Sequence, residues 1–260
     1  MALQGLVMAL SLAISVLSGF MGIGGGILMA PALLYLPPLF GVGTLDMKMV
    51  SGLTIAQALV ACLSGAIRHG KYRYVNRRLV RWMGGSILGS ALAGSVASRW
   101  FTNEMLMAIF AGLAIVASAL MLLPKKEGEE VTDADSYSFN QPLAAGIAIV
   151  VGFLGGLVGQ GGSFIIIPLM LYLLNLPTRV VIGSSLGIVF FSSIAGFAGK
   201  LATGQIPLLL AASVALGAFP GAQLGGVLSR RTKPALLRFA LAVVVALAAV
   251  KMGGDVLQTW

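Results

Sequence analysis

The stretch Gly19-Phe-Met-Gly-Ile-Gly-Gly-Gly-Ile-Leu-Met-Ala-Pro31 decides the fold, because it recurs as Gly156-Leu-Val-Gly-Gln-Gly-Gly-Ser-Phe-Ile-Ile-Ile-Pro168. The glycines at its first, fourth, sixth and seventh positions and the final proline keep their register. Glycine interrupts helices, and in a bilayer the freed backbone groups are tolerated only inside protein or along a wet cavity. The pattern therefore predicts that each stretch belongs to a membrane segment that is either a broken helix or a re-entrant hairpin.

Matches continue beyond the glycine runs and predict an internal duplication. Lys48, Gly52, Thr54 and Gly65 fall in order on Arg179, Gly183, Ser185 and Gly196. We expect a first membrane repeat over residues 1–123, a polar linker over 124–141 that acts as a flexible connector, and a second membrane repeat over 142–260. Such duplication is common in secondary transporters.

The composition is that of an all-α integral membrane protein. The chain is 58% hydrophobic and only 10% charged over 260 residues, more apolar surface than one soluble core of this size needs. Apolar stretches near the length of a spanning helix predict four membrane segments per half. They cover residues 5–36, 47–67, 80–100, 105–123, 142–174, 178–202, 206–229 and 234–256.

The net charge of +9 does not predict a nucleic-acid partner, because the basic residues lie between apolar stretches. The densest basic run, Arg68 to Arg81, is typical of a cytoplasmic loop. If the first segment of each half is a hairpin, the repeats are inverted, both termini lie outside, and thirteen basic residues lie inside against four. If every segment crosses once, the repeats are parallel, and ten basic residues lie inside against seven outside. The positive-inside rule favours the arrangement with the larger excess inside, which is the inverted one.

The paired glycine loops are the candidate binding site. A helix that begins just after such a loop presents unpaired N–H groups and the positive end of its dipole, and glycines let an oxyanion approach the backbone. We expect two half-helix N-termini to meet near the midplane around an anion. The residues predicted to bind substrate are Gly22, Gly24, Gly25, Gly26, Thr54, Gln57, Gly159, Gln160, Gly161, Gly162, Ser163, Ser184 and Ser185.

Some of these residues have a structural alternative. Intramembrane hydroxyls such as those of Ser184, Ser185, Ser192 and Ser193 often bond their own helix or a neighbour. Lys48 and Arg179, at the starts of their helices, are predicted to guide an anion electrostatically, with snorkelling to the interface as the alternative. No Asp or Glu lies in the middle of an apolar segment, so we expect no intramembrane proton relay, and no metal or cofactor.

These motifs resemble those of the sulfite exporter TauE/SafE family of permeases, over essentially the whole chain. The resemblance rests on Gly22 to Pro31 followed by Gly52-Leu-Thr54, and on Gly159 to Pro168 followed by Gly183-Ser-Ser185-Leu. It implies a multi-pass protein of a bacterial inner membrane that transports small sulfur-containing anions such as sulfite or organosulfonates. The partners it implies are this anion and the lipid bilayer, and whether the chain forms a homodimer stays open.

Two other classes of function remain beside a secondary carrier that works by alternating access. An anion channel or facilitator without ion coupling fits the lack of carboxylates equally well. An intramembrane enzyme using Ser184 or Ser185 with His69 is disfavoured, because the histidine lies outside the apolar core and a nucleophile needs its base within hydrogen-bond reach. We therefore expect a transporter rather than an enzyme, and export is favoured because an inside-negative potential drives anions outward by about 2.3 kcal/mol per charge per 100 mV.

Overall fold

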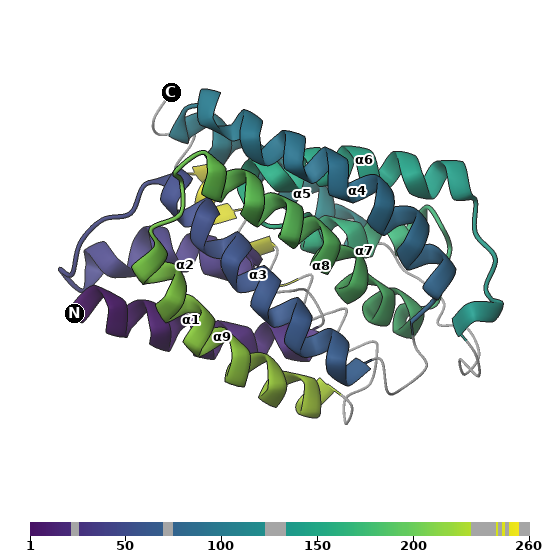
Figure 1. Cartoon of the computed structure of the whole chain (residues 1–260), viewed down its shortest axis with the longest axis horizontal. Helices are drawn as coiled ribbons and strands as arrows, with labels where there is room; N and C mark the ends of the chain where they lie inside the picture. The colour runs from purple at the N-terminus through teal and green to yellow at the C-terminus, as the bar shows by residue number, and fades with distance from the viewer. Residues whose placement is uncertain are drawn as a thin grey trace.

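The computed structural model describes residues 1–21, 26–69, 75–122, 134–229, 243, 246–247 and 250–254, and within these ranges it contains helices and no strands. The chain is a helical bundle (Figure 1). Its helices are α1 (Ala2–Met21), α2 (Gly26–Leu39), α3 (Met47–His69), α4 (Arg77–Ala97), η2 (Ser98–Trp100), α5 (Asn103–Leu122), η3 (Ala134–Ser136), α6 (Gln141–Val158), α7 (Ser163–Tyr172), α8 (Thr178–Ala202) and α9 (Leu208–Ser229).

Six of the described helices are long and apolar enough to cross a membrane, namely α1, α3, α5, α6, α8 and α9. Helix α4 is long as well but opens with three arginines, Arg77, Arg78 and Arg81, which lower its hydropathy. Helices α2 and α7 are apolar and shorter. This confirms a multi-pass helical membrane protein, whereas the arrangement of eight segments in two repeated halves stays a prediction.

The two long first segments of the predicted halves are each divided into two helices. Residues 5–36 hold α1 and α2, and residues 142–174 hold α6 and α7. In the second pair the chain turns back on itself, since a Cβ on Gly155 would meet the backbone of Gly162 and one on Gly162 would meet Val151. Of the predicted segment 234–256, the structure describes residues 243, 246–247 and 250–254, which are helical.

Helices far apart in sequence pack side by side through glycine. Helix α1 lies along α9 and α6 lies along α4, as Figure 1 shows at the lower and upper edges of the bundle. A Cβ on Gly19 would lie 2.6 Å from the carbonyl oxygen of Ala222, and one on Gly156 would collide with that of Ala91. Such close backbone approach is how helices gain contacts in lipid.

Not every glycine on these helices packs. Gly94, Gly217 and Gly221 approach neighbouring backbones closely, whereas a Cβ on Gly85 or Gly89 would meet no described atom within 4 Å. The last two glycines therefore make no close helix contact within the described ranges, and they lie on the exposed side of α4.

The end of the predicted linker is packed rather than flexible. Asn76, which caps the N-terminus of α4 by accepting from the Leu79 N–H, donates from its amide to the carbonyls of Ala134 and Tyr137 at 2.8 and 3.2 Å. Asp135 accepts from the Arg77 backbone N–H at 2.7 Å. These bonds anchor the entry to α6 against the start of α4.

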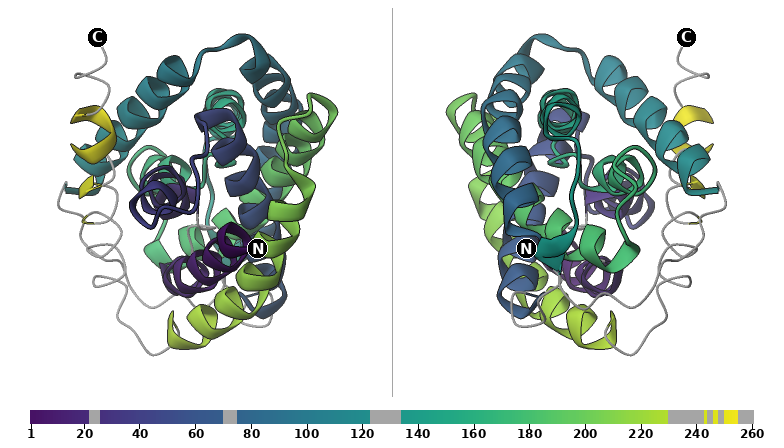
Figure 2. Two further views of the ribbon diagram at one scale, coloured as in Figure 1. Left: turned by 90° about the vertical axis from the view of Figure 1, so that its left-hand side faces the viewer. Right: turned by 90° about the vertical axis from the view of Figure 1, so that its right-hand side faces the viewer.

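Helix α5 diverges from α4 after η2, as the end-on views show (Figure 2), and packs on α7 instead. The ring centroids of Phe110 and Phe164 lie 5.8 Å apart, and both side chains are fully buried. This contact holds the first turn of α7, directly after the second glycine loop, inside the protein.

Candidate functional site

The second glycine loop, Gly159 to Gly162, has a backbone that only glycine adopts easily. Gly159, Gly161 and Gly162 have φ angles of 75°, 59° and 71°, in the left-handed region where L side chains are strained. A Cβ on Gly159 would also collide with the Ser51 carbonyl of α3. The loop ends α6, reverses the chain and starts α7 at Ser163.

Gln160, in the second glycine loop, lies against the start of α2. Its side chain is fully buried, and neither its amide oxygen nor its amide nitrogen has a hydrogen-bond partner among the described residues. A Cβ on Gly26, the first residue of α2, would lie 3.2 Å from the Gln160 side chain. Gly26 and Gln160 are thus brought together from the two predicted halves.

Three hydroxyls extend the polar surroundings of the loop. Ser163, Ser192 and Ser193 are buried, and their Oγ atoms lack partners in the part of the chain that the structure describes. A Cβ on Gly161 would lie 3.1 Å from Ser193 Oγ and 3.5 Å from Ser192 Oγ, so α8 presents these serines to the loop. We call Gln160, Ser163, Ser192 and Ser193 the central polar cluster.

An unpaired polar atom inside a protein is costly. Each buried donor or acceptor without a partner costs about 1–3 kcal/mol, so a group of them is expected where a ligand or water completes the bonds. The cluster lies at the N-terminus of α7, whose backbone dipole favours negative charge. The arrangement therefore offers amide and hydroxyl donors to an oxyanion.

Two predicted binding residues on α3 are already engaged. Thr54 lies within hydrogen-bond reach of two carbonyl oxygens, at 2.8 Å from that of Gly159 and 3.1 Å from that of Ser51, which places its hydroxyl as a support of the loop. Gln57 donates from Nε2 to Ser15 Oγ of α1 at 2.9 Å, while its buried Oε1 lacks a partner among the described residues. Thr54 therefore touches the site through the loop backbone, and Gln57 keeps one free acceptor.

The hydroxyls of Ser184 and Ser185 are both engaged in hydrogen bonds. Ser184 Oγ accepts from the Asn76 backbone N–H at 3.0 Å, which ties α8 to the start of α4. Ser185 Oγ donates to the Ile182 carbonyl of its own helix at 3.0 Å. These bonds favour the structural alternative for both serines, and their binding of substrate stays a prediction.

The predicted guiding charges lie away from the cluster. Lys48 donates from Nζ to the Arg99 carbonyl at 3.1 Å, bridging α3 and η2, and Arg179 is exposed at the start of α8. Their guidance of an anion stays a prediction. The candidate residues Gly22, Gly24 and Gly25 lie outside the described residues, as does the His69 side chain.

Lys200 is the residue that sequence reasoning missed. It is fully buried and donates from Nζ to Ser98 Oγ at 2.9 Å, Gln205 Oε1 at 3.1 Å and the Leu157 carbonyl at 3.3 Å. All three partners are uncharged. Helix α8 therefore holds a buried ionisable side chain behind the last turn of α6.

Metal ligation has no basis in the described ranges, where no three His, Cys, Asp or Glu side chains gather into a group that could hold an ion. The cluster offers amide and hydroxyl groups, which can donate hydrogen bonds to an anion.

Comparison with known proteins gives consistent relatives. The family described as sulfite exporter TauE/SafE matches residues 7–252. The probable membrane transporter protein YunE of Bacillus subtilis is 25% identical over 93% of this chain and 94% of its own length. A probable membrane transporter protein of Methanocaldococcus jannaschii is 24% identical, covering 89% of this chain and 88% of its own length.

No solved structure matches the chain. The assignment therefore depends on the sequence comparisons and on the helical membrane architecture, which agree. The relatives are transporters and none of their names describes an enzyme, as expected from the sequence. The chain belongs to the sulfite exporter TauE/SafE family and is a membrane transporter.

Proposed function

We propose that this transporter moves small sulfur-containing oxyanions, such as sulfite or an organosulfonate, and binds them at the central polar cluster. The observation that carries the proposal is the buried Gln160 amide, unpaired at both atoms and packed against Gly26. A sulfur oxyanion presents several acceptor oxygens around one centre. It can accept from the Gln160 amide and from the hydroxyls of Ser163, Ser192 and Ser193.

In its protonated form, the buried Lys200 side chain supports an anionic substrate. Buried charges in proteins are normally paired, yet the partners of Lys200 are neutral. Its contact with the Leu157 carbonyl places it two residues before Gly159, where the loop begins. A positive charge behind the loop raises the electrostatic potential at the cluster and favours an anion over a neutral solute of the same shape.

We further propose that the chain is built of two inverted repeats that move against each other around the cluster. A Cβ on Gly52 of α3 would meet the backbone of Gln205, just past the end of α8. A Cβ on Gly196 of α8 would lie 2.9 Å from the side chain of Ile55 of α3. Because the contacts move forward along α3 as they move backward along α8, the two helices run antiparallel. Antiparallel equivalents are what an in-plane pseudo-two-fold axis produces. The contacts of Gly19 with Ala222 and of Gly156 with Ala91 are related in the same way.

The enclosed position of the cluster favours a carrier over a channel. Gln160, Ser192 and Ser193 have no exposed surface, so an ion cannot pass the cluster without a rearrangement of the helices. Alternating access supplies that rearrangement. With the Arg68 to Arg81 run placed in the cytoplasm of a bacterial inner membrane, the membrane potential drives the anion outward, and we propose export as the direction.

Thermal stabilisation of the purified protein by a panel of anions tests the proposal. Sulfite, thiosulfate, sulfoacetate, isethionate, sulfate and chloride are compared on the parent protein, on Gln160→Leu and on Gln223→Leu. Gln223 is a matched amide on α9 that donates to the Ser64 carbonyl, away from the cluster. A selective shift for a sulfur oxyanion that Gln160→Leu loses and Gln223→Leu keeps is expected. No selective shift, or one indifferent to Gln160, contradicts the proposed site.

Counterflow in proteoliposomes separates the two mechanisms. A carrier loaded with unlabelled anion accelerates uptake of labelled anion and saturates with concentration. A channel shows neither behaviour, and that outcome would replace the carrier by the alternative of an anion facilitator.

A further inference from the structure

A cavity of about 490 Å³ lies against the first turns of α4, away from the central polar cluster. Its described lining is Arg78, Arg81, Trp82, Gly85 and Ser86. Its volume is within the range of ordinary small-molecule sites, about 300–1,000 Å³. The transport mechanism proposed above makes no use of it.

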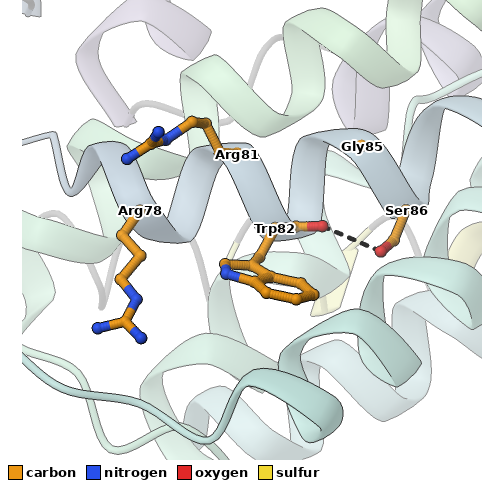
Figure 3. A pocket seen from close by; sticks show the side chains of 5 residues that line it. All are labelled: Arg78, Arg81, Trp82, Gly85 and Ser86. Carbon is orange, nitrogen blue, oxygen red and sulfur yellow. Dashed lines mark hydrogen bonds between the residues drawn. The ribbon is translucent and has the colours of Figure 1, made fainter.

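The lining places two arginines and an aromatic ring along the first turns of one helix. Figure 3 shows Arg78 and Trp82 projecting to one edge of α4, while the Arg81 side chain projects to the opposite edge and extends back toward the end of the helix that carries Arg78. The two guanidinium groups therefore flank the cavity. Trp82 is 47% exposed. The Ser86 hydroxyl donates a hydrogen bond to the backbone carbonyl of Trp82 at 2.9 Å.

The two arginines are available to an anion. No carboxylate pairs with Arg78 or Arg81 within the ranges that the structure describes, and the Gln141 amide oxygen is the one neutral acceptor within reach of Arg78. A guanidinium binds phosphate through parallel N–H donors, which makes arginine the usual residue at such sites. The polar end of the cavity thus suits a phosphate group.

The remainder of the face suits a hydrocarbon chain. Beyond the arginines, Gly85 leaves open space where a side chain would stand, and Leu88 and Leu92 are each 40% exposed. Arg81 to Leu92 covers about 16 Å along a helix axis, close to the ~15 Å half-thickness of the bilayer core. Tryptophan beside such a face is typical of the membrane–water interface.

From these observations we infer that Arg78, Arg81 and Trp82 form a binding site for the phosphate headgroup of an anionic phospholipid, whose acyl chain lies along Gly85, Leu88 and Leu92. Basic pockets at the ends of membrane helices bind anionic headgroups in this manner. The site is independent of the transported substrate, because it shares no residue with the central polar cluster. A free phosphate would meet the same two guanidinium groups but would have no use for the apolar face, so the apolar face favours a lipid.

Quenching of Trp82 by brominated lipid tests the site. A variant with Trp100→Phe and Trp260→Phe keeps Trp82 as its one tryptophan, and is reconstituted in phosphatidylcholine with a minor fraction of dibromo-phosphatidylglycerol or of dibromo-phosphatidylcholine. Preferential quenching by the brominated phosphatidylglycerol is expected, with an enrichment of roughly thirtyfold for two arginines beside an anionic lipid. Equal quenching by the two lipids would overturn the proposal.

Matched variants assign the preference to the pocket. The double variant Arg78→Gln/Arg81→Gln is expected to lose the preferential quenching by brominated phosphatidylglycerol. Arg77→Gln is expected to keep this preference, because Arg77 is on the same turn but does not line the cavity. A variant that retains Trp100 alone is expected to show no preference. Persistence of the preference in the double variant contradicts the assignment.

A competition arm distinguishes a lipid from a soluble phosphate. Inorganic phosphate or glycerol phosphate at millimolar concentration is added to the vesicles. A lipid site retains the quenching, because the acyl chain contributes to binding; displacement by soluble phosphate would show that the pocket takes a free anion and would overturn the lipid assignment.

Discussion

Gly26 at the start of α2 packs directly on Gln160 of the second glycine loop, with 3.2 Å separating Gln160 Cβ, Cγ and Cδ from the position of a Cβ on Gly26. The contact joins residues from the two predicted halves of the chain at a fully buried amide. Any side chain added at Gly26 takes space from Gln160 and therefore from the substrate proposed to bind there.

Gly26→Val is expected to reduce anion binding about tenfold or more, since overpacking a buried site costs about 1–3 kcal/mol. Gly26→Ala should have a smaller effect, because the single methyl group requires the Gln160 side chain to shift by only a few tenths of an ångström. Gly112→Ala on α5, where a Cβ meets no described atom within 4 Å, is the control. Binding is measured as anion-dependent thermal stabilisation, and unchanged binding in the valine variant would remove Gly26 from the site.

Gly159→Ala is expected to destabilise the protein far more than Gly204→Ala. Both residues have left-handed φ angles, 75° and 71°, so both substitutions carry a strain of about 1–2 kcal/mol. A Cβ on Gly159 also collides with the Ser51 carbonyl, whereas one on Gly204 has open space. Melting temperatures in detergent without ligand measure the difference. Similar values for the two variants would show that the α3 backbone at Ser51 shifts to make room for the added Cβ.

Lys200→Met is expected to abolish most of the anion-induced stabilisation, because it removes the positive charge behind the second loop. Lys200→Arg keeps a cationic side chain and should retain part of the anion-induced stabilisation. Arg77→Gln removes an exposed cation at the start of α4, and should leave affinity unchanged. Equal affinity in Lys200→Met and the parent protein would show that the buried cation does not act on the substrate.

Ser184→Ala and Ser193→Ala are expected to have opposite effects. The first leaves the buried Asn76 N–H without its acceptor, so stability falls by about 1–3 kcal/mol while the anion-induced shift persists. The second removes a hydroxyl that has no described partner, so the unliganded protein is as stable as before but the shift shrinks. Thermal unfolding with and without sulfite distinguishes them, and a normal shift in Ser193→Ala would exclude that serine from binding.

The glycine loops show why part of the site was predictable from sequence. A repeated Gly-x-Gly-Gly run inside an apolar stretch has few structural solutions, because it must break a helix where backbone groups can still be satisfied. The turn between α6 and α7, the start of α7 at Ser163 and the proximity of Gly26 to Gln160 agree with that reasoning. These features depend on local backbone chemistry, which the sequence carries directly.

Ser184 and Lys200 show what the sequence alone does not reveal. The partner of Ser184 is Asn76, 108 residues earlier, and the same hydroxyl without that neighbour would be a reasonable ligand. Lys200 stands near the end of an apolar segment, where a lysine usually snorkels to the interface. The polar run Thr203-Gly204-Gln205 that follows was the available signal, since it supplies the Gln205 oxygen to which Lys200 donates.

The packing of α1 on α9 has a consequence for biosynthesis. Ser11 donates to the Val214 carbonyl at 2.7 Å, so α1 has its main neighbour 203 residues downstream. Until α9 is inserted, the serine and the contact surface of α1 stay uncovered in the lipid. Insertion of α9 therefore completes the packing of α1, and a nascent chain truncated before α9 presents an incompletely packed α1 to the quality-control proteases of the membrane.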